Sequence, residues 1–318
     1  MKSEQSYKGH LTMFVLNIIF GLNTSITKSV LSDTLTPYSI YFLRIAGAGL
    51  LFWIASIFVK ENKVNSRDLM MLFLAGMLGV TINQFTFIKG LSLTSPINAA
   101  IIITLTPIIT MILAAIYQKE PVTSKKAMGV FIGACGALLL ILTSAQMSNS
   151  AGNMTGNLLC LLSSLSYAFY LTAFKGLIMK HSPVTLMKWM FLFSAIVSLP
   201  VCLNDIEAIQ WQIIPMNGYL RIGYVVILAT FVTYMFIPVG QKLLRPTTLS
   251  MYNYLQPLVA SLAAMAMGLD YFGWNTALAA VLVFCGVYVV TQSKSRVQLE
   301  EEASKNLSPS PSSQERGD

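Results

Sequence analysis

The chain has 318 residues, of which 55% are hydrophobic and 11% are charged, and its formal net charge is +8. Soluble domains carry about a quarter charged residues, so this composition excludes an ordinary soluble domain. The basic residues lie on alternate connections between apolar segments instead of forming the basic patch of a nucleic-acid binder. The composition therefore predicts a membrane protein whose principal surroundings are the lipid bilayer, with no nucleic-acid partner.

The apolar segments recur along most of the chain, and each is long enough to cross about 30 Å of hydrocarbon as a helix. A transmembrane barrel would alternate polar and apolar residues with period two, and an open sheet would leave backbone groups unpaired in lipid. The predicted fold class is therefore an all-α integral membrane protein. We expect ten transmembrane helices, at residues 10–30, 37–59, 68–89, 95–117, 125–144, 156–178, 183–203, 219–243, 247–269 and 274–292.

The distribution of basic residues predicts which side of the membrane each connection faces. Lysine and arginine concentrate on every second connection, which is the positive-inside pattern of cytoplasmic loops. With an even number of spans, both termini are expected in the cytoplasm, and the protein in the cytoplasmic (inner) membrane. Lys2 and Lys8 precede an apolar stretch that is too long for the h-region of a cleavable signal peptide and lacks a clear small-residue cleavage site, so the first helix is expected to remain as an uncleaved anchor. Residues 293–318 are rich in Ser, Pro, Glu and Gln and predict a disordered cytoplasmic tail.

A shift of 150 residues superimposes residues that fix backbone shape or helix boundaries. The matched residues are Gly90 with Gly240, Pro96 with Pro246, Pro107 with Pro257, and Glu120 with Asp270. This pattern predicts two repeats, residues 10–144 and 156–292, with five spans each. An odd number of spans inverts the second repeat, as in many secondary transporters. A duplication kept only for packing, in a channel or scaffold, is the alternative.

The acidic residues and histidines lie in connections, at helix ends or in the tail, so no proton-relay carboxylate or imidazole is expected deep in a span. Their absence from the spans argues against an intramembrane enzyme, and no catalytic residue, metal site or cofactor is predicted. The sequence contains no phosphate-binding glycine loop of the kind that would indicate an ATP-driven pump. We therefore predict that transport is not driven by protons.

Arg44 is the single charged side chain expected well inside a span, about 10 Å from the outer end of the second helix. A charge at that depth is costly unless it faces protein, water or a ligand. Two roles stay open: binding helix-end carbonyls, or attracting an anionic group of a substrate.

Neutral polar residues also recur within the spans. Each one alone is more often an interhelical hydrogen-bonding group than a ligand contact. Together they predict a polar cavity with aromatic walls, suited to a zwitterion or a small polar-aromatic molecule. The candidate substrate-binding residues are Asn23, Arg44, Asn83, Gln84, Asn98, Tyr167, Tyr170, Tyr234, Asn253 and Gln256.

Pro107 and Pro257 lie near the middles of the fourth and ninth spans, where each removes a backbone donor and favours a kink. Their matched positions make them candidate hinges.

The fifth span carries small residues near one face, at Gly129, Gly133 and Gly136. Small residues predict close helix packing, and the tenth span is one candidate for the helix that packs there.

Several short motifs resemble EamA-type proteins of the drug/metabolite transporter superfamily. They are Phe20-Gly21-Leu22-Asn23 with Lys28, Pro37 and Arg44; Ser95-Pro96 through Pro107 to Glu120; and Tyr167-Ala168 with Pro246, Pro257 and Asp270. The resemblance implies ten helices around a central cavity, with the fifth and tenth peripheral. It also implies transport of amino acids, metabolites, sugars or drugs, often outward.

The function expected from residues and resemblance is secondary transport of a small-molecule substrate by alternating access, with export of amino acids or related metabolites favoured. Uptake or exchange of nucleotide sugars or other phosphorylated solutes is the alternative within transport. A non-transporting membrane enzyme or scaffold is the alternative from another class. A homodimer is left open by the sequence.

Overall fold

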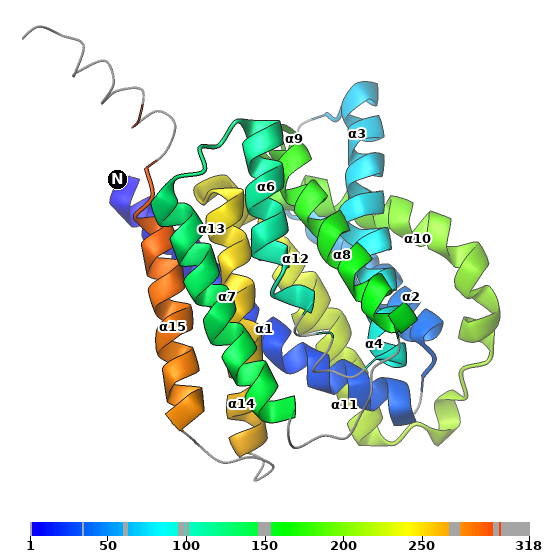
Figure 1. Ribbon diagram of the computed structural model, residues 1–318. Helices are drawn as coiled ribbons and strands as arrows, with labels where there is room; N and C mark the ends of the chain where they lie inside the picture. The colour runs from blue at the N-terminus through cyan, green and yellow to red at the C-terminus, as the bar shows by residue number, and fades with distance from the viewer. Residues whose placement is uncertain are drawn as a thin grey trace, which may run out of the picture.

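The computed structural model describes residues 2–33, 35–59, 63–94, 99, 102–145, 154–266, 274–294 and 299. These residues form helices and no strand (Figure 1). Six helical runs are long and apolar enough to cross a membrane: Tyr7–Leu31, Pro37–Ile57, Ser66–Leu93, Met154–Ala173, Pro183–Glu207 and Met216–Leu243. The expectation of an all-helical, multi-pass membrane protein is confirmed.

The first half of the chain contains α1 (Lys2–Asp33), α2 (Pro37–Ile57), α3 (Ser66–Gly76), η1 (Met77–Ile82), α4 (Asn83–Leu93), α6 (Thr106–Gln118) and α7 (Ser124–Ala145). The second half contains α8 (Met154–Ala173), α9 (Lys175–Lys180), α10 (Pro183–Glu207), η2 (Trp211–Ile213), α11 (Met216–Gly223), η3 (Tyr224–Val232), α12 (Thr233–Leu243), α13 (Pro246–Met251), η4 (Tyr252–Tyr254), α14 (Leu255–Ala266) and α15 (Trp274–Thr291).

Helices α2 and α10 begin in the same way. The side chain of Thr36 accepts a hydrogen bond from the Ser39 backbone amide at the start of α2, and Pro37 occupies the first turn. At the start of α10, the side chain of Ser182 accepts a hydrogen bond from the Thr185 backbone amide, and Pro183 occupies the first turn. A hydroxyl cap followed by proline fixes a helix start, because the cap satisfies a free N–H and proline needs no acceptor.

The fourth and ninth spans are not the continuous helices that we expected at 95–117 and 247–269. A turn at Thr104 and Leu105 precedes α6, and the short 3₁₀ segment η4 separates α13 from α14. Pro107 and Pro257 follow these interruptions by two and three residues. Proline lacks an N–H and its ring clashes with the carbonyl four residues earlier, which favours an interruption or a kink, although α10 runs through Pro200 without a break. Pro107 lies in the first turn of α6.

The third and eighth spans each contain a π-helical segment. η1 joins α3 to α4, and η3 joins α11 to α12, without a break in the helical run. Such wide turns are rare and are frequent at functional sites. Asn83 and Gln84 follow η1 directly, and Tyr234 follows η3 by one residue.

Helices α7 and α15 lie side by side at one edge of the molecule (Figure 1). Glycines let their backbones meet: a Cβ at Gly286 would stand 2.6 Å from the backbone nitrogen of Gly133 and 2.7 Å from the carbonyl oxygen of Gly129. The predicted packing of the fifth span's glycines against the tenth span is confirmed.

The other helices pack around a shared interior. α2 packs against α10, with the rings of Phe52 and Phe191 5.2 Å apart between centroids. α1 contacts α12 and α14, whereas α8 contacts α4 and α6. These contacts bring α1, α4, α6, α8, α12 and α14 around one space.

Arg44 is not the only basic side chain buried within a helix, contrary to our expectation. Lys126 is 1% exposed and pairs with Glu120 at 3.0 Å. Lys188 in α10 is 7% exposed, and its ammonium lies 4.9 Å from the ring centroid of Trp53. Lysine near a helix end keeps its stem among apolar groups, which is why sequence position alone did not indicate this burial.

Candidate functional site

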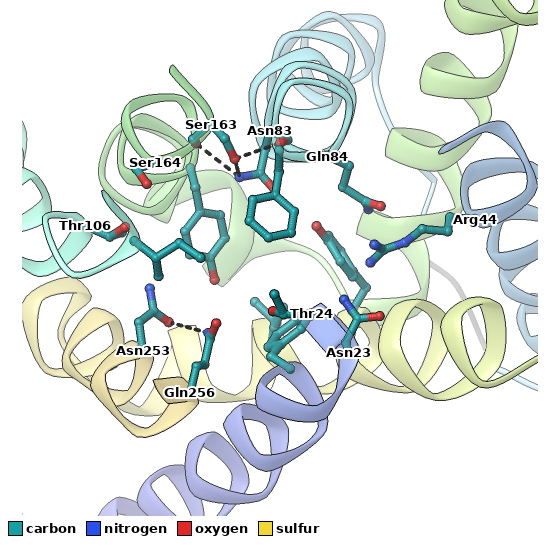
Figure 2. Close-up of a pocket in the computed structure, with 16 residues that line it drawn as sticks. Asn23, Thr24, Arg44, Asn83, Gln84, Thr106, Ser163, Ser164, Asn253 and Gln256 are labelled. Carbon is teal, nitrogen blue, oxygen red and sulfur yellow. Dashed lines mark hydrogen bonds between the residues drawn. The ribbon is translucent and has the colours of Figure 1, made fainter. Parts of the chain in front are cut away.

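A cavity of about 110 Å³ lies between the helices of the two halves of the chain (Figure 2). Its walls come from α1, α2, α4, α6, α8, α12, η4 and α14, together with residues just before α6. The lining residues are Phe20, Asn23, Thr24, Arg44, Asn83, Gln84, Phe87, Ile103, Thr106, Ser163, Ser164, Tyr167, Tyr234, Ile237, Asn253 and Gln256.

Eight of the ten residues that we expected at a substrate site line this cavity: Asn23, Arg44, Asn83, Gln84, Tyr167, Tyr234, Asn253 and Gln256. Asn98 lies outside the described residues. Tyr170 is not among the lining residues; it is 1% exposed, and its hydroxyl donates to Gln241 Oε1 at 3.3 Å. One turn of α8 thus places Tyr167 at the cavity and Tyr170 in the packing beside it.

Arg44 faces the cavity while it is anchored from behind. Its Nε donates to Thr230 Oγ1 at 2.9 Å, and one terminal nitrogen donates to the carbonyl oxygen of Ala229 at 3.4 Å. Guanidinium has five N–H donors in a rigid plane. The two contacts leave the edge between the two terminal nitrogens for another partner, and Figure 2 shows the group directed into the cavity. Both roles left open for Arg44 are therefore compatible with this geometry.

Gln84 extends toward Arg44 from α4 (Figure 2). It is 4% exposed, and neither its amide oxygen nor its amide nitrogen has a hydrogen-bond partner of acceptable geometry within the described part of the chain. The Tyr234 hydroxyl is the polar group close to this amide. Buried amides are nearly always paired, so an unpaired one facing a cavity marks a place for water or a ligand.

Other polar residues of the lining hold helices together. Asn83 Nδ2 donates to the carbonyl oxygen and to Oγ of Ser163, at 3.1 and 3.0 Å, and Ser163 Oγ donates back to the Asn83 carbonyl at 2.8 Å. Gln256 Nε2 donates to Asn17 Oδ1 at 3.0 Å. These bonds tie α4 to α8 and α14 to α1, so Asn83 and Gln256 have the interhelical role that any single polar residue in a span favours.

The interrupted helices turn their N-terminal ends toward the cavity. Thr106 is the first residue of α6, Gln256 lies in the first turn of α14, and both line the cavity. No side chain caps the first turn of α6. A helix N-terminus carries a partial positive charge from its unpaired N–H groups, which adds to the charge of Arg44.

The described cavity lining carries a positive charge and no negative one. Arg44 is the only ionisable group of fixed charge among the described lining residues, which contain no Asp, Glu, Lys or His. No group of three or more His, Cys, Asp or Glu suited to a metal ion occurs in the described residues. The arrangement offers neutral hydrogen bonding, aromatic surface and one cation, which are means of binding a small molecule.

The family model of the EamA-like transporter family matches residues 7–142 and again 154–292. The chain belongs to the EamA-like transporter family. Relatives of this EamA chain carry transporter names. The uncharacterized transporter YyaM of Bacillus subtilis is 24% identical over 285 residues, which cover 87% of this chain and 93% of YyaM. An uncharacterized transporter of Archaeoglobus fulgidus is 26% identical over 260 residues, covering 82% and 90%.

A WAT1-related protein of Arabidopsis thaliana is 33% identical over 140 residues, which cover 41% of the EamA chain and 38% of the plant protein. A crystal structure with 18% sequence identity superposes with a TM-score of 0.73, covering 95% of this chain and all of the other. At this identity the superposition shows the fold alone. The family match and the names of the relatives support a membrane transporter.

Sequence reasoning missed several lining residues of this EamA protein as site candidates: Phe20, Thr24, Phe87, Ile103, Thr106, Ser164 and Ile237. Two signals could have found some of them. Phe87 follows Gln84 by one helical turn, and the shift of 150 residues matches Phe87 with Ile237 and Thr106 with Gln256. Polar type alone was too narrow a criterion, because apolar side chains form part of most small-molecule sites.

Proposed function

We propose that this EamA protein is a secondary transporter with ten spans in two inverted five-helix repeats, which moves a small metabolite by alternating access. The observation that carries the proposal is the origin of the cavity lining. Gln84 and Tyr234, 150 residues apart, both line it, as do Thr106 and Gln256. A site drawn from matched positions of two repeats can be exposed to either side when one repeat moves against the other.

The helix contacts support the inverted repeat. The contact between α4 and α8 has its counterpart in the contact between α1 and α12, and the contact between α6 and α8 has its counterpart between α1 and α14. α2 with α10 and α7 with α15 pair corresponding helices directly. The family model also matches twice, at segments close to the proposed repeats 10–144 and 156–292.

The proposed substrates are amino acids or related small metabolites, carried outward across the cytoplasmic membrane, with both termini of the chain in the cytoplasm. Arg44 would bind a carboxylate, and Phe20, Phe87 and Tyr167 would contact the body of the substrate. Nucleotide sugars and other phosphorylated solutes are less suited, because a single guanidinium in the described lining would face two or more negative charges. An enzyme would need an acid–base or nucleophilic group, which the described lining lacks.

Counterflow in proteoliposomes tests the proposal. Vesicles loaded with an unlabelled mixture of amino acids and small organic acids should take up trace amounts of labelled members of the mixture. Protein-free vesicles and vesicles with the Arg44→Gln variant give the background. Exchange by the wild-type protein above both backgrounds supports carrier function, whereas equal rates in all three preparations would overturn it for these compounds.

A further inference from the structure

The charge of the cavity lining narrows the substrate further than the proposed function does. We propose that this site selects small monoanions, with a carboxylate bound between Arg44 and Gln84 and an uncharged body, over zwitterions such as free amino acids. The inference rests on the proposed carrier function and, of the substrates proposed there, favours the related monoanionic metabolites over the free amino acids.

The carboxylate position is defined by two unsatisfied groups. Arg44 is held by Thr230 and Ala229 through one edge of its guanidinium, which leaves the edge between the two terminal nitrogens toward the cavity. Beside it, neither polar atom of the buried Gln84 amide has a hydrogen-bond partner of acceptable geometry among the described residues, although the Tyr234 hydroxyl lies close to this amide. A carboxylate at this place would accept two parallel hydrogen bonds from Arg44 and one from the Gln84 Nε2 group, which is the strongest form of recognition available to such a group.

The described part of the lining contains no acidic counterpart for an ammonium. The acceptors among the described lining residues are neutral: side-chain amides, hydroxyls and backbone carbonyls. Proline leaves the carbonyls of Ile103 and Asn253 without their helical donor, because each lies four residues before a proline. Such carbonyls can accept hydrogen bonds from an ammonium as well as from hydroxyl or amide groups, but they carry no net charge to offset its buried positive charge.

The helix ends act in the same direction as Arg44. α6 and α14 have 13 and 12 residues, and both begin at the cavity. Their N-terminal partial charges are positive, so they favour a negative ligand and oppose an ammonium. The balance of one full positive charge, two positive helix ends and no acid in the described lining is complementary to a ligand with one net negative charge.

Two matched pairs of compounds isolate the ammonium. 3-Phenylpropionate and L-phenylalanine differ only in the α-amino group, as do butyrate and 2-aminobutyrate. Thermal unfolding of the purified full chain in detergent, measured across a concentration series of each compound, gives an apparent Kd from the stabilisation. We expect the monoanion of at least one pair to have a Kd about tenfold lower than its zwitterion, since burying an ammonium without a charged partner costs more than about 1.4 kcal/mol.

The variant Gln84→Glu keeps the shape of the side chain and adds a negative charge beside Arg44. It should remove the binding of the monoanion, whereas Gln210→Glu, on an exposed residue between α10 and α11, should leave it unchanged. Equal or tighter binding of both zwitterions by the wild-type protein would overturn the inference and leave the carrier proposal intact. Absence of binding by all four compounds would also overturn it, while counterflow with the mixed metabolites decides the carrier proposal separately.

Discussion

Arg44 on α2 donates from Nε to Thr230 Oγ1 on η3 at 2.9 Å, and Thr230 in turn donates to the carbonyl oxygen of Val225 at 2.7 Å. The accepting hydroxyl therefore belongs to a π-helical turn, and its own proton is used within that turn. Thr230 fixes the direction of the guanidinium, so it is a positioning residue, while Arg44 is the group that would touch a substrate.

The substitution Arg44→Gln should weaken apparent substrate affinity by about tenfold or more while the protein still inserts, because it removes the charge and the two-pronged contact. Arg44→Lys should restore affinity poorly, since an ammonium cannot reproduce the planar fork. Affinities follow from counterflow at varied substrate concentration. A variant that unfolds readily in detergent but binds with unchanged affinity would assign Arg44 a structural role only.

Pro107→Ala and Pro257→Ala should impair transport with near-normal membrane abundance. Alanine supplies the missing N–H and removes the clash, so α6 and α14 can extend through the interruptions at the cavity. Straighter helices would change the balance between inward-open and outward-open states. Pro200, exposed within the continuous helix α10, is the matched control, and Pro200→Ala should transport normally. Normal transport rates in both single variants and in the double variant would show that these prolines are not hinges.

Gly286→Ala should lower thermal stability in detergent by about 1–3 kcal/mol, because the added methyl meets backbone atoms of Gly129 and Gly133 that cannot move aside. Gly223→Ala is the control: no heavy atom lies within 4 Å of the added Cβ, and alanine is the better helix former. No residue of α7 or α15 is among the described lining residues of the cavity, so substrate affinity should be unchanged in both variants. Equal stability of the two would show that the seam tolerates wider spacing.

Single cysteines test the proposed topology. Asn217 at the start of α11 and Ser124 at the start of α7 are both exposed. In a functional background without the four native cysteines, an impermeant maleimide should label position 217 in intact cells and position 124 only after permeabilisation. Labelling at Ser150 should follow Asn217, and labelling at Asn62 should follow Ser124; both lie outside the described residues. Equal labelling of all positions in intact cells would contradict the inverted arrangement.

An imposed pH difference should not drive substrate uphill in proteoliposomes. The described lining contains an arginine and neutral groups, none of which changes charge near neutral pH. Lys188 is buried beside Trp53 and Trp189 and is not among the described lining residues, so Lys188→Met should leave counterflow intact. Accumulation against the substrate gradient that a protonophore abolishes would contradict this prediction.

Much of the helical framework could be predicted from apolar length and from helix-start signals. The second span was expected from residue 37, and α2 begins at Pro37 because a hydroxyl cap and a proline mark its start. The seventh was expected from residue 183, and α10 begins at Pro183 after the same kind of cap. The interruption before Pro107 was expected only as a kink, because the sequence does not say whether a helix bends or breaks at a proline.

The cavity was predictable in part. Asn23, Arg44 and Gln84 are polar groups in apolar surroundings, so their cost in lipid singled them out. The hydrogen-bond partners of the lining residues could not be predicted from the sequence. Asn83 bonds Ser163 and Gln256 bonds Asn17, across helices whose relative rotation depends on packing. Tyr170 shares a helical stripe with Tyr167, but it lies one turn further along α8, where it packs beside the cavity and does not line it.

The π-helical turn η1 has a consequence for the angle at which the site residues are presented. A π turn holds one residue more than an α turn, so the backbone could accept the loss of one residue from Met77–Ile82 by reverting to regular helix. Such a deletion would leave α4 close to its present rotation, because the wide turn is what accommodates the extra residue. The same residues wound as regular helix would instead rotate everything beyond them by about 100° around the helix axis, carrying Gln84 away from Arg44 while α3 stayed in place. The wide turn therefore sets which face of α4 meets the cavity.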